Sequence, residues 1–151
     1  AAKKGCIAVP TLVAYDALAL EGEALGLGAA EFAKIEIVRS GGLRSLEVMR
    51  DAGLPMAFGS DLLGSLRQYH CMEFELLAKV LTPADIIRSA TTIGAQLCRL
   101  EGEAGVIAAG ASADLLVVDG NPLDTIGLLQ DDGAHLPVIM ARGRLAKNEL
   151  H

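Results

Sequence analysis

Residues 56–61 read Met-Ala-Phe-Gly-Ser-Asp, a short apolar run that ends in an acid, Asp61. An apolar run of this length, bounded by turn residues, predicts a strand that is covered on both faces, as in a parallel sheet. In a (β/α)8 barrel the carboxyl end of such a strand carries the chemistry, because the strand holds the side chain rigidly while the next loop faces the substrate. Asp61 is therefore the leading catalytic candidate.

A second apolar run lies upstream, where residues 6–13 read Cys-Ile-Ala-Val-Pro-Thr-Leu-Val. It predicts the preceding barrel strand, with residues 11–15 at its catalytic end. Between the two runs, from residue 31 to residue 52, apolar residues recur at the three- and four-residue spacing of a helix, and the pair Gly41-Gly42 is expected to weaken or bend it. Gly53 and Pro55 then predict the end of that helix.

The segment after Asp61 supplies the candidate substrate-binding residues. Residues 62–69 predict a loop across the barrel mouth, where Arg67 and Tyr69 are candidate substrate contacts, as is Tyr15 in the earlier segment. The alternative is that all three are solvated loop residues. Residues 71–81 predict a helix, and the stretch Thr-Pro-Ala-Asp at 82–85 is a helix start that opens another helix through residue 97.

Beyond residue 101 the pattern changes. Glycines at 102, 105 and 110 punctuate short strand-like runs at 105–107 and 113–118, and residues 137–145 suit a hairpin. We therefore divide the chain into residues 1–101 and residues 102–151. Asp114 begins the most recognisable of these runs and is interpreted as a structural turn residue.

Two motifs in this order, Gly-Ser-Asp at 59–61 and Ala-Asp-Leu-Leu-Val-Val-Asp-Gly-Asn-Pro-Leu at 113–123, resemble the amidohydrolase superfamily, in particular its imidazolonepropionase-like and Xaa-Pro dipeptidase-like members. The resemblance runs over essentially the whole chain. It implies an α/β fold: the last two βα units of a TIM (β/α)8 barrel (residues 1–101), followed by the C-terminal strands of a small β-sandwich (residues 102–151).

The resemblance also implies a chemistry. In this superfamily one or two divalent metals, here expected to be zinc, activate water for attack on a carbonyl. It assigns Asp61 two roles, a weak metal ligand and a catalytic shuttle that carries a proton to the departing amine. The alternative for Asp61 is an ordinary turn or helix-capping acid, because Gly-Ser-Asp is also common turn chemistry.

Most of the metal ligands that the superfamily needs are not in this sequence. The only histidines are His70, His135 and His151, and none forms a His-x-His pair. His70 has Glu73 and Glu75 nearby, but a surface or supporting histidine is favoured over a metal site there. We therefore expect a C-terminal fragment of a longer enzyme, inactive in isolation, whose missing N-terminal segment binds most of the metal.

The composition and net charge restrict the kinds of binding partner that we expect for this chain. The net charge is −6, and no Lys/Arg-rich run is present, so nucleic-acid binding is not expected. No apolar stretch reaches the length of a membrane span. Three cysteines without paired spacing fit a reducing compartment, so a cytoplasmic location is expected. The oligomeric state is open, and a homo-oligomer is compatible with the sequence.

These observations support two alternative functions. The first is a metal-dependent hydrolase that cleaves amide or peptide-like C–N bonds in a small-molecule amide or dipeptide, as a Xaa-Pro dipeptidase or an acyl-amino-acid hydrolase does. The alternative is a non-catalytic remnant or interaction module of the same fold, which ligand counting favours if these residues are the entire gene product.

Overall fold

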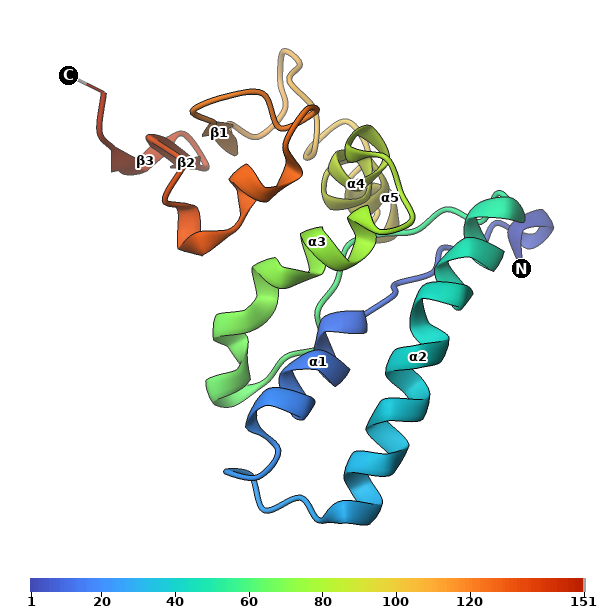
Figure 1. Ribbon diagram of the computed structural model, residues 1–151. Coiled ribbons are helices and arrows are strands. Elements are labelled where there is room, and N and C mark those ends of the chain that lie inside the picture. The colour runs from blue at the N-terminus through green and yellow to red at the C-terminus, as the bar shows by residue number, and fades with distance from the viewer. Residues whose placement is uncertain (151) are drawn as a thin grey trace.

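The computed structural model describes residues 1–150, which form a helical body followed by a small antiparallel sheet (Figure 1). His151, predicted not to be a metal ligand, lies outside the described residues. In chain order the elements are η1 (Ala2–Lys4), α1 (Leu12–Glu21), α2 (Ala29–Asp51), η2 (Gly64–Met72), α3 (Glu73–Ala78), α4 (Pro83–Ala90), α5 (Thr92–Leu97), β1 (Leu115–Val117), η3 (Ile126–Leu129), η4 (Asp131–Gly133), β2 (Val138–Ala141) and β3 (Arg144–Asn148), where η marks a 3-10 helix. None of the helices in the described part of the chain is long and apolar enough to cross a membrane.

The two predicted barrel strands lie side by side, but they pair over a single bridge. Ala8 pairs with Met56 in the parallel sense. The Ala8 N–H donates to the Pro55 carbonyl at 2.9 Å, and the Ala57 N–H donates to the Ala8 carbonyl at 2.8 Å. The predicted direction is thus present, but the predicted strand extent over residues 6–13 is wrong, because α1 already begins at Leu12. Within residues 1–150 each segment has a strand partner on one edge only, whereas a barrel strand is paired on both.

The long predicted helix is confirmed as α2, and the glycine pair in its middle does not break it. Gly42 is buried where α1 approaches α2, since a Cβ added there would lie 2.8 Å from Leu12 Cδ2. The glycine therefore allows the close packing of the two helices.

The region after Asp61 is more helical than predicted. Residues 64–72 form η2 where a loop was expected, and the predicted helix at 71–81 is regular only over α3. The predicted helix start is confirmed, because the Thr82 side chain accepts a hydrogen bond from the Asp85 N–H at 3.2 Å. The single helix expected after it is divided into α4 and α5 at Thr91, whose φ of −121° and ψ of −92° are not helical.

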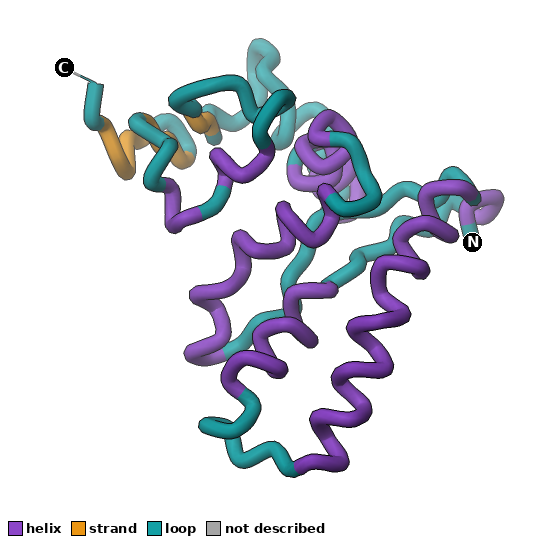
Figure 2. Tube along the Cα trace, in the orientation of Figure 1, coloured by secondary structure: helices purple, strands orange, loops and turns teal. Residues whose placement is uncertain are grey.

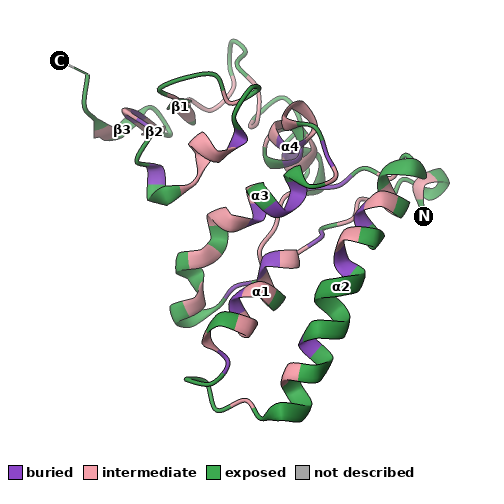
Figure 3. Ribbon diagram, in the orientation of Figure 1, coloured by how far each residue is buried: buried purple, intermediate pink, exposed green. Residues whose placement is uncertain are grey.

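The core consists of two clusters of buried apolar side chains. One joins α2, α3, α4 and η3, and it is built from Leu46, Met56, Leu77, Leu81, Ile86 and Ile126. The other, which we call the Leu62 cluster, contains Val13, Ala17, Leu62 and Leu76. Figure 3 shows that much of α2 is exposed on the side away from these clusters.

The three strands lie in the order β1-β2-β3 and are antiparallel, which confirms the predicted C-terminal hairpin (Figure 2). The strand predicted at 105–107 is wrong, because that segment is irregular. Asp114 has the structural role expected of it. Its carboxylate accepts the Ser112 hydroxyl at 2.6 Å and the Arg142 N–H at 2.7 Å, and these hydrogen bonds lower the pKa of Asp114.

Candidate active site

Asp61 lies just beyond the paired segment, in a turn that presents its side chain to solvent. Its backbone has a φ of +53°, in the left-handed region that Asp and Asn adopt more readily than other non-glycine residues. The next residue, Leu62, is buried in the Leu62 cluster. Since the Ala8 and Met56 segments run parallel, residues 11 and 61 follow their paired segments in the same direction. This is the side of a parallel barrel where catalytic groups lie.

A surface depression of about 440 Å³ lies next to the two chain neighbours of Asp61. It is lined by Ser60, Leu62, Arg67, Gln68 and His70. Arg67 is exposed there, so its guanidinium is available for a ligand in the depression. The structure thus brings Arg67, a predicted substrate contact, to the immediate neighbours of Asp61.

Tyr69 points elsewhere. Its hydroxyl donates to the Glu21 carboxylate at the end of α1, and its ring packs on the Leu62 cluster. This hydrogen bond is the main cause of a raised pKa at Tyr69, and burial raises that pKa further. The hydroxyl therefore ties η2 to α1, and a substrate-binding role for Tyr69 stays a prediction.

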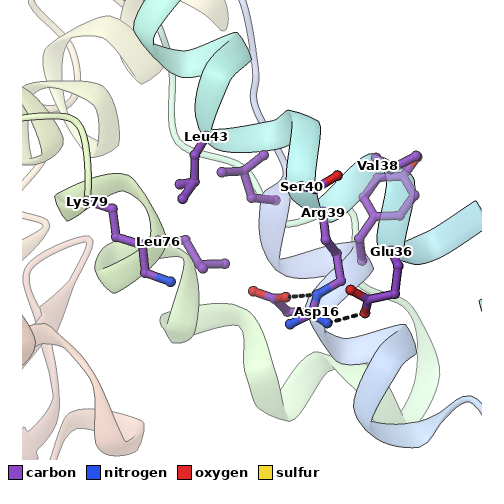
Figure 4. A pocket seen from close by; sticks show the side chains of 10 residues that line it. Asp16, Glu36, Val38, Arg39, Ser40, Leu43, Leu76 and Lys79 are labelled. Carbon is purple, nitrogen blue, oxygen red and sulfur yellow. Dashed lines mark hydrogen bonds and ion pairs between the residues drawn. The ribbon is translucent and has the colours of Figure 1, made fainter.

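Tyr15 lines a separate hollow of about 250 Å³ between α1, α2 and α3, together with Leu12, Leu43, Leu76 and Lys79 (Figure 4). In that hollow Arg39 lies between the carboxylates of Asp16 and Glu36 and bonds to both. Tyr15 and Arg67 therefore line different hollows. A substrate contact by Tyr15 also stays a prediction.

Glu73 is a functional candidate that the sequence analysis considered only as a neighbour of His70. Its side chain is 0% exposed. Its carboxylate accepts the N–H groups of Leu12 at 3.3 Å and of Val13 at 2.7 Å, which are the first two amides of α1. Burial raises the pKa of Glu73 to about 7, although the two backbone hydrogen bonds oppose the rise. One sequence signal was available: Leu76 and Leu77 follow at three and four residues, which puts Glu73 on their face of a helix.

Among residues 1–150 no group of three His, Cys, Asp or Glu side chains could hold a metal ion. His70 is exposed, with its Nδ1 2.7 Å from the Arg67 carbonyl oxygen, whereas Glu73 is directed inward to α1. The described residues can therefore offer the Asp61 carboxylate as one ligand, but they do not form a complete site.

Comparison with known proteins identifies the class. The model of the amidohydrolase family matches residues 1–145, and the chain belongs to that family. Its fold is correspondingly a mixed α/β portion of a TIM-barrel hydrolase that ends in the small sheet. No curated protein matches the chain.

Several solved structures resemble it. A crystal structure of an amidohydrolase has a TM-score of 0.94 and 49% identity, covering 99% of this chain and 36% of that one. A prolidase complexed with N-methylphosphonate-L-proline has a TM-score of 0.90 and 45% identity, covering 97% and 36%. A Xaa-Pro dipeptidase with bound methionine in the active site has a TM-score of 0.82 and 26% identity, covering 97% and 36%. The chain thus spans about a third of the length of these structures.

Proposed function

We propose that this chain is part of a metal-dependent hydrolase that cleaves an amide or peptide-like C–N bond, with Asp61 as its proton carrier. The observation that carries the proposal is the position of Asp61. Its carboxylate is exposed just beyond the parallel pair of segments, beside a depression, in a chain of the amidohydrolase family. The family supports the hydrolase class, and the position supports the choice of residue.

Hydrolysis of an amide needs a group near the scissile bond that first accepts a proton and then donates it. A metal bound at the site lowers the pKa of water and so supplies a nucleophile near neutral pH. The Asp61 carboxylate takes up the proton that the water gives up as its oxygen bonds to the carbonyl carbon. It then returns that proton to the amine nitrogen as the C–N bond breaks, which gives a carboxylic acid and an amine; the second proton then passes from the acid to the amine, so that the products near neutral pH are a carboxylate and an ammonium group.

We propose a dipeptide with a C-terminal proline, or an N-acyl amino acid, as the substrate. Two similar structures, described as a prolidase and a Xaa-Pro dipeptidase, support this class. Such substrates carry a free carboxylate, and Arg67 in the depression after Asp61 offers a matching guanidinium. In this proposal Arg67 binds the substrate carboxylate, and Asp61 lies toward the scissile bond.

The metal, which we propose to be zinc, would be held by Asp61 and by residues beyond the 151 of this chain. The alternative is a non-catalytic module of the same fold, which ligand counting would favour only if these 151 residues were the entire gene product. Metal content separates the two. The hydrolase proposal expects at least one zinc per full-length protein and none held stoichiometrically by the isolated 151 residues.

The experiment measures metal content and hydrolysis of Xaa-Pro dipeptides and N-acyl amino acids by the full-length protein. Turnover that disappears on chelation and returns with zinc supports the hydrolase. A full-length protein that holds no metal and hydrolyses neither substrate class supports the non-catalytic module instead.

A further inference from the structure

The buried carboxylate of Glu73 joins two segments that flank the candidate site. It belongs to the first turn of α3, after the η2 segment that follows Asp61, and it accepts the first two N–H groups of α1. The residue before α1, Thr11, provides no side-chain cap of its own. The start of α1 is therefore capped by a residue 60 positions away in the sequence.

The same face of α3 carries an apolar contact to the same helix. Leu76, one turn after Glu73, shares the Leu62 cluster with Val13 and Ala17 of α1. The remaining member of the cluster is Leu62, which is 8% exposed and immediately follows Asp61 in the chain. The buried surface beneath Asp61 is thus partly made by the turn of α1 that Glu73 holds.

A displacement of α1 would be transmitted to Asp61 through the contact of Val13 with Leu62. Val13 both donates its N–H to Glu73 and packs in the Leu62 cluster. If the cap is lost, the buried Val13 N–H and the half-buried Leu12 N–H lose their acceptor, which destabilises the first turn of α1. Any shift of Val13 that relieves this destabilisation also moves the support of Leu62. The left-handed turn at Asp61 then loses its anchor.

We propose that Glu73 is a positioning residue for Asp61, acting through the first turn of α1 and the Leu62 cluster. The inference rests on the catalytic role proposed for Asp61. The structural part of the inference is the coupling between residues 11–17 and residues 60–64. This coupling does not depend on enzymatic activity. The negative charge of Asp16, one turn into α1, adds to the effect of burial in raising the pKa of Glu73.

The test compares full-length wild type with Glu73→Gln, which keeps the side-chain volume but replaces one of the two acceptor oxygens with an amide nitrogen that donates and cannot accept. Glu75→Gln is the matched control, because Glu75 lies on the same helix and is exposed. Hydrogen exchange at constant pH is followed in peptides covering residues 11–17 and 60–64. Glu73→Gln should speed exchange at least tenfold in both segments, and Glu75→Gln should change neither.

Turnover provides the second readout. Glu73→Gln should lower kcat at least tenfold, with KM within about threefold of wild type and metal content unchanged, because a misplaced proton carrier slows the chemical step rather than binding. Glu73→Asp, which keeps both acceptor oxygens on a shorter stem, should recover part of kcat. A general loss of folded protein would instead lower kcat and metal content together.

A second variant keeps the proposal testable if Glu73→Gln folds poorly. Leu62→Val removes one methylene group from the Leu62 cluster next to Asp61. It should lower kcat with little change in KM, as expected for Glu73→Gln. Combined with Glu73→Asp, its effect should be less than multiplicative, because both changes act on one path. Fast exchange confined to residues 11–17, or fully multiplicative effects, would overturn the positioning role. If wild type itself hydrolyses nothing, the proposed function fails, and the exchange data alone decide the coupling.

Discussion

Gly59 lies against Val9 so closely that a Cβ added at position 59 would be 2.4 Å from Val9 Cγ1. This contact joins the two parallel segments just beyond their Ala8–Met56 bridge, one residue after Ala8 and three residues after Met56. A glycine is required there because the segment that leads into Asp61 has no room for a side chain on that side.

Gly59→Ala is therefore expected to destabilise the protein, since overpacking of a close contact typically costs about 1–3 kcal/mol. The free energy of unfolding in urea measures the loss. Val9→Ala in the same chain should restore most of it, because the opposing methyl groups are removed. A Gly59→Ala protein as stable as wild type would show that the two segments are not in close contact in solution.

Glu73 gives the unfolding free energy a pH dependence of known sign. Its pKa is about 7 in the folded chain against an ordinary value of 4.5, so the folded state binds the proton more tightly than the unfolded state. The stabilisation that this provides is complete below about pH 4.5 and is lost as pH rises through 7. One unit of pKa corresponds to about 1.4 kcal/mol, so the loss is on the order of 3 kcal/mol.

Urea unfolding at a series of pH values from 4.5 to 8 measures this in wild type and Glu73→Gln. The Gln side chain does not titrate, so the stability of wild type relative to Glu73→Gln should fall steadily as pH rises. A constant difference between the two proteins would mean that Glu73 is not buried as a titrating carboxyl group. Glu75→Gln, on the exposed side of the same helix, should follow the wild-type curve.

Arg67 is expected to set substrate affinity rather than rate. In Arg67→Met the substrate carboxylate loses its charged hydrogen-bond donor, and KM for a Xaa-Pro dipeptide should rise roughly tenfold or more while kcat changes little. Steady-state kinetics with the dipeptide and with its C-terminal amide provide the comparison. The amide lacks the carboxylate, so the substitution should affect it weakly.

Gln68→Met is the matched control for Arg67→Met, since Gln68 lines the same depression. It should leave KM within about twofold of wild type. Equal losses for the dipeptide and its amide would show that Arg67 does not recognise the carboxylate.

Local signals in the sequence predicted the elements whose determinants are themselves local. The α2 helix, the cap at Thr82 and the C-terminal hairpin were predicted because each depends on neighbouring residues. The direction of the two parallel segments followed from their apolar runs. Their strand extent did not, because strand length depends on the partners available at both edges.

The candidate site was predictable only in part for the same reason. Asp61 and Arg67 follow an apolar run, and Arg67 lines a depression together with Ser60 and Leu62, the two chain neighbours of Asp61. Glu73 was overlooked because its partners are amides 60 and 61 residues away; the local spacing of Leu76 and Leu77 places it on an apolar helix face but does not identify those partners. The bond between Tyr69 and Glu21 is a contact of the same long-range kind. Long-range polar contacts of this kind are set by packing rather than by propensity.

The most direct test of the account is the kcat of Asp61→Asn in the full-length enzyme with a Xaa-Pro dipeptide. Asn tolerates the left-handed backbone found at position 61, so the turn is retained while the proton carrier is lost. With Asp119→Asn, an exposed turn acid, as the control, kcat should fall about 10²-fold or more in Asp61→Asn alone. Turnover by Asp61→Asn within a few-fold of wild type would contradict the catalytic role of Asp61.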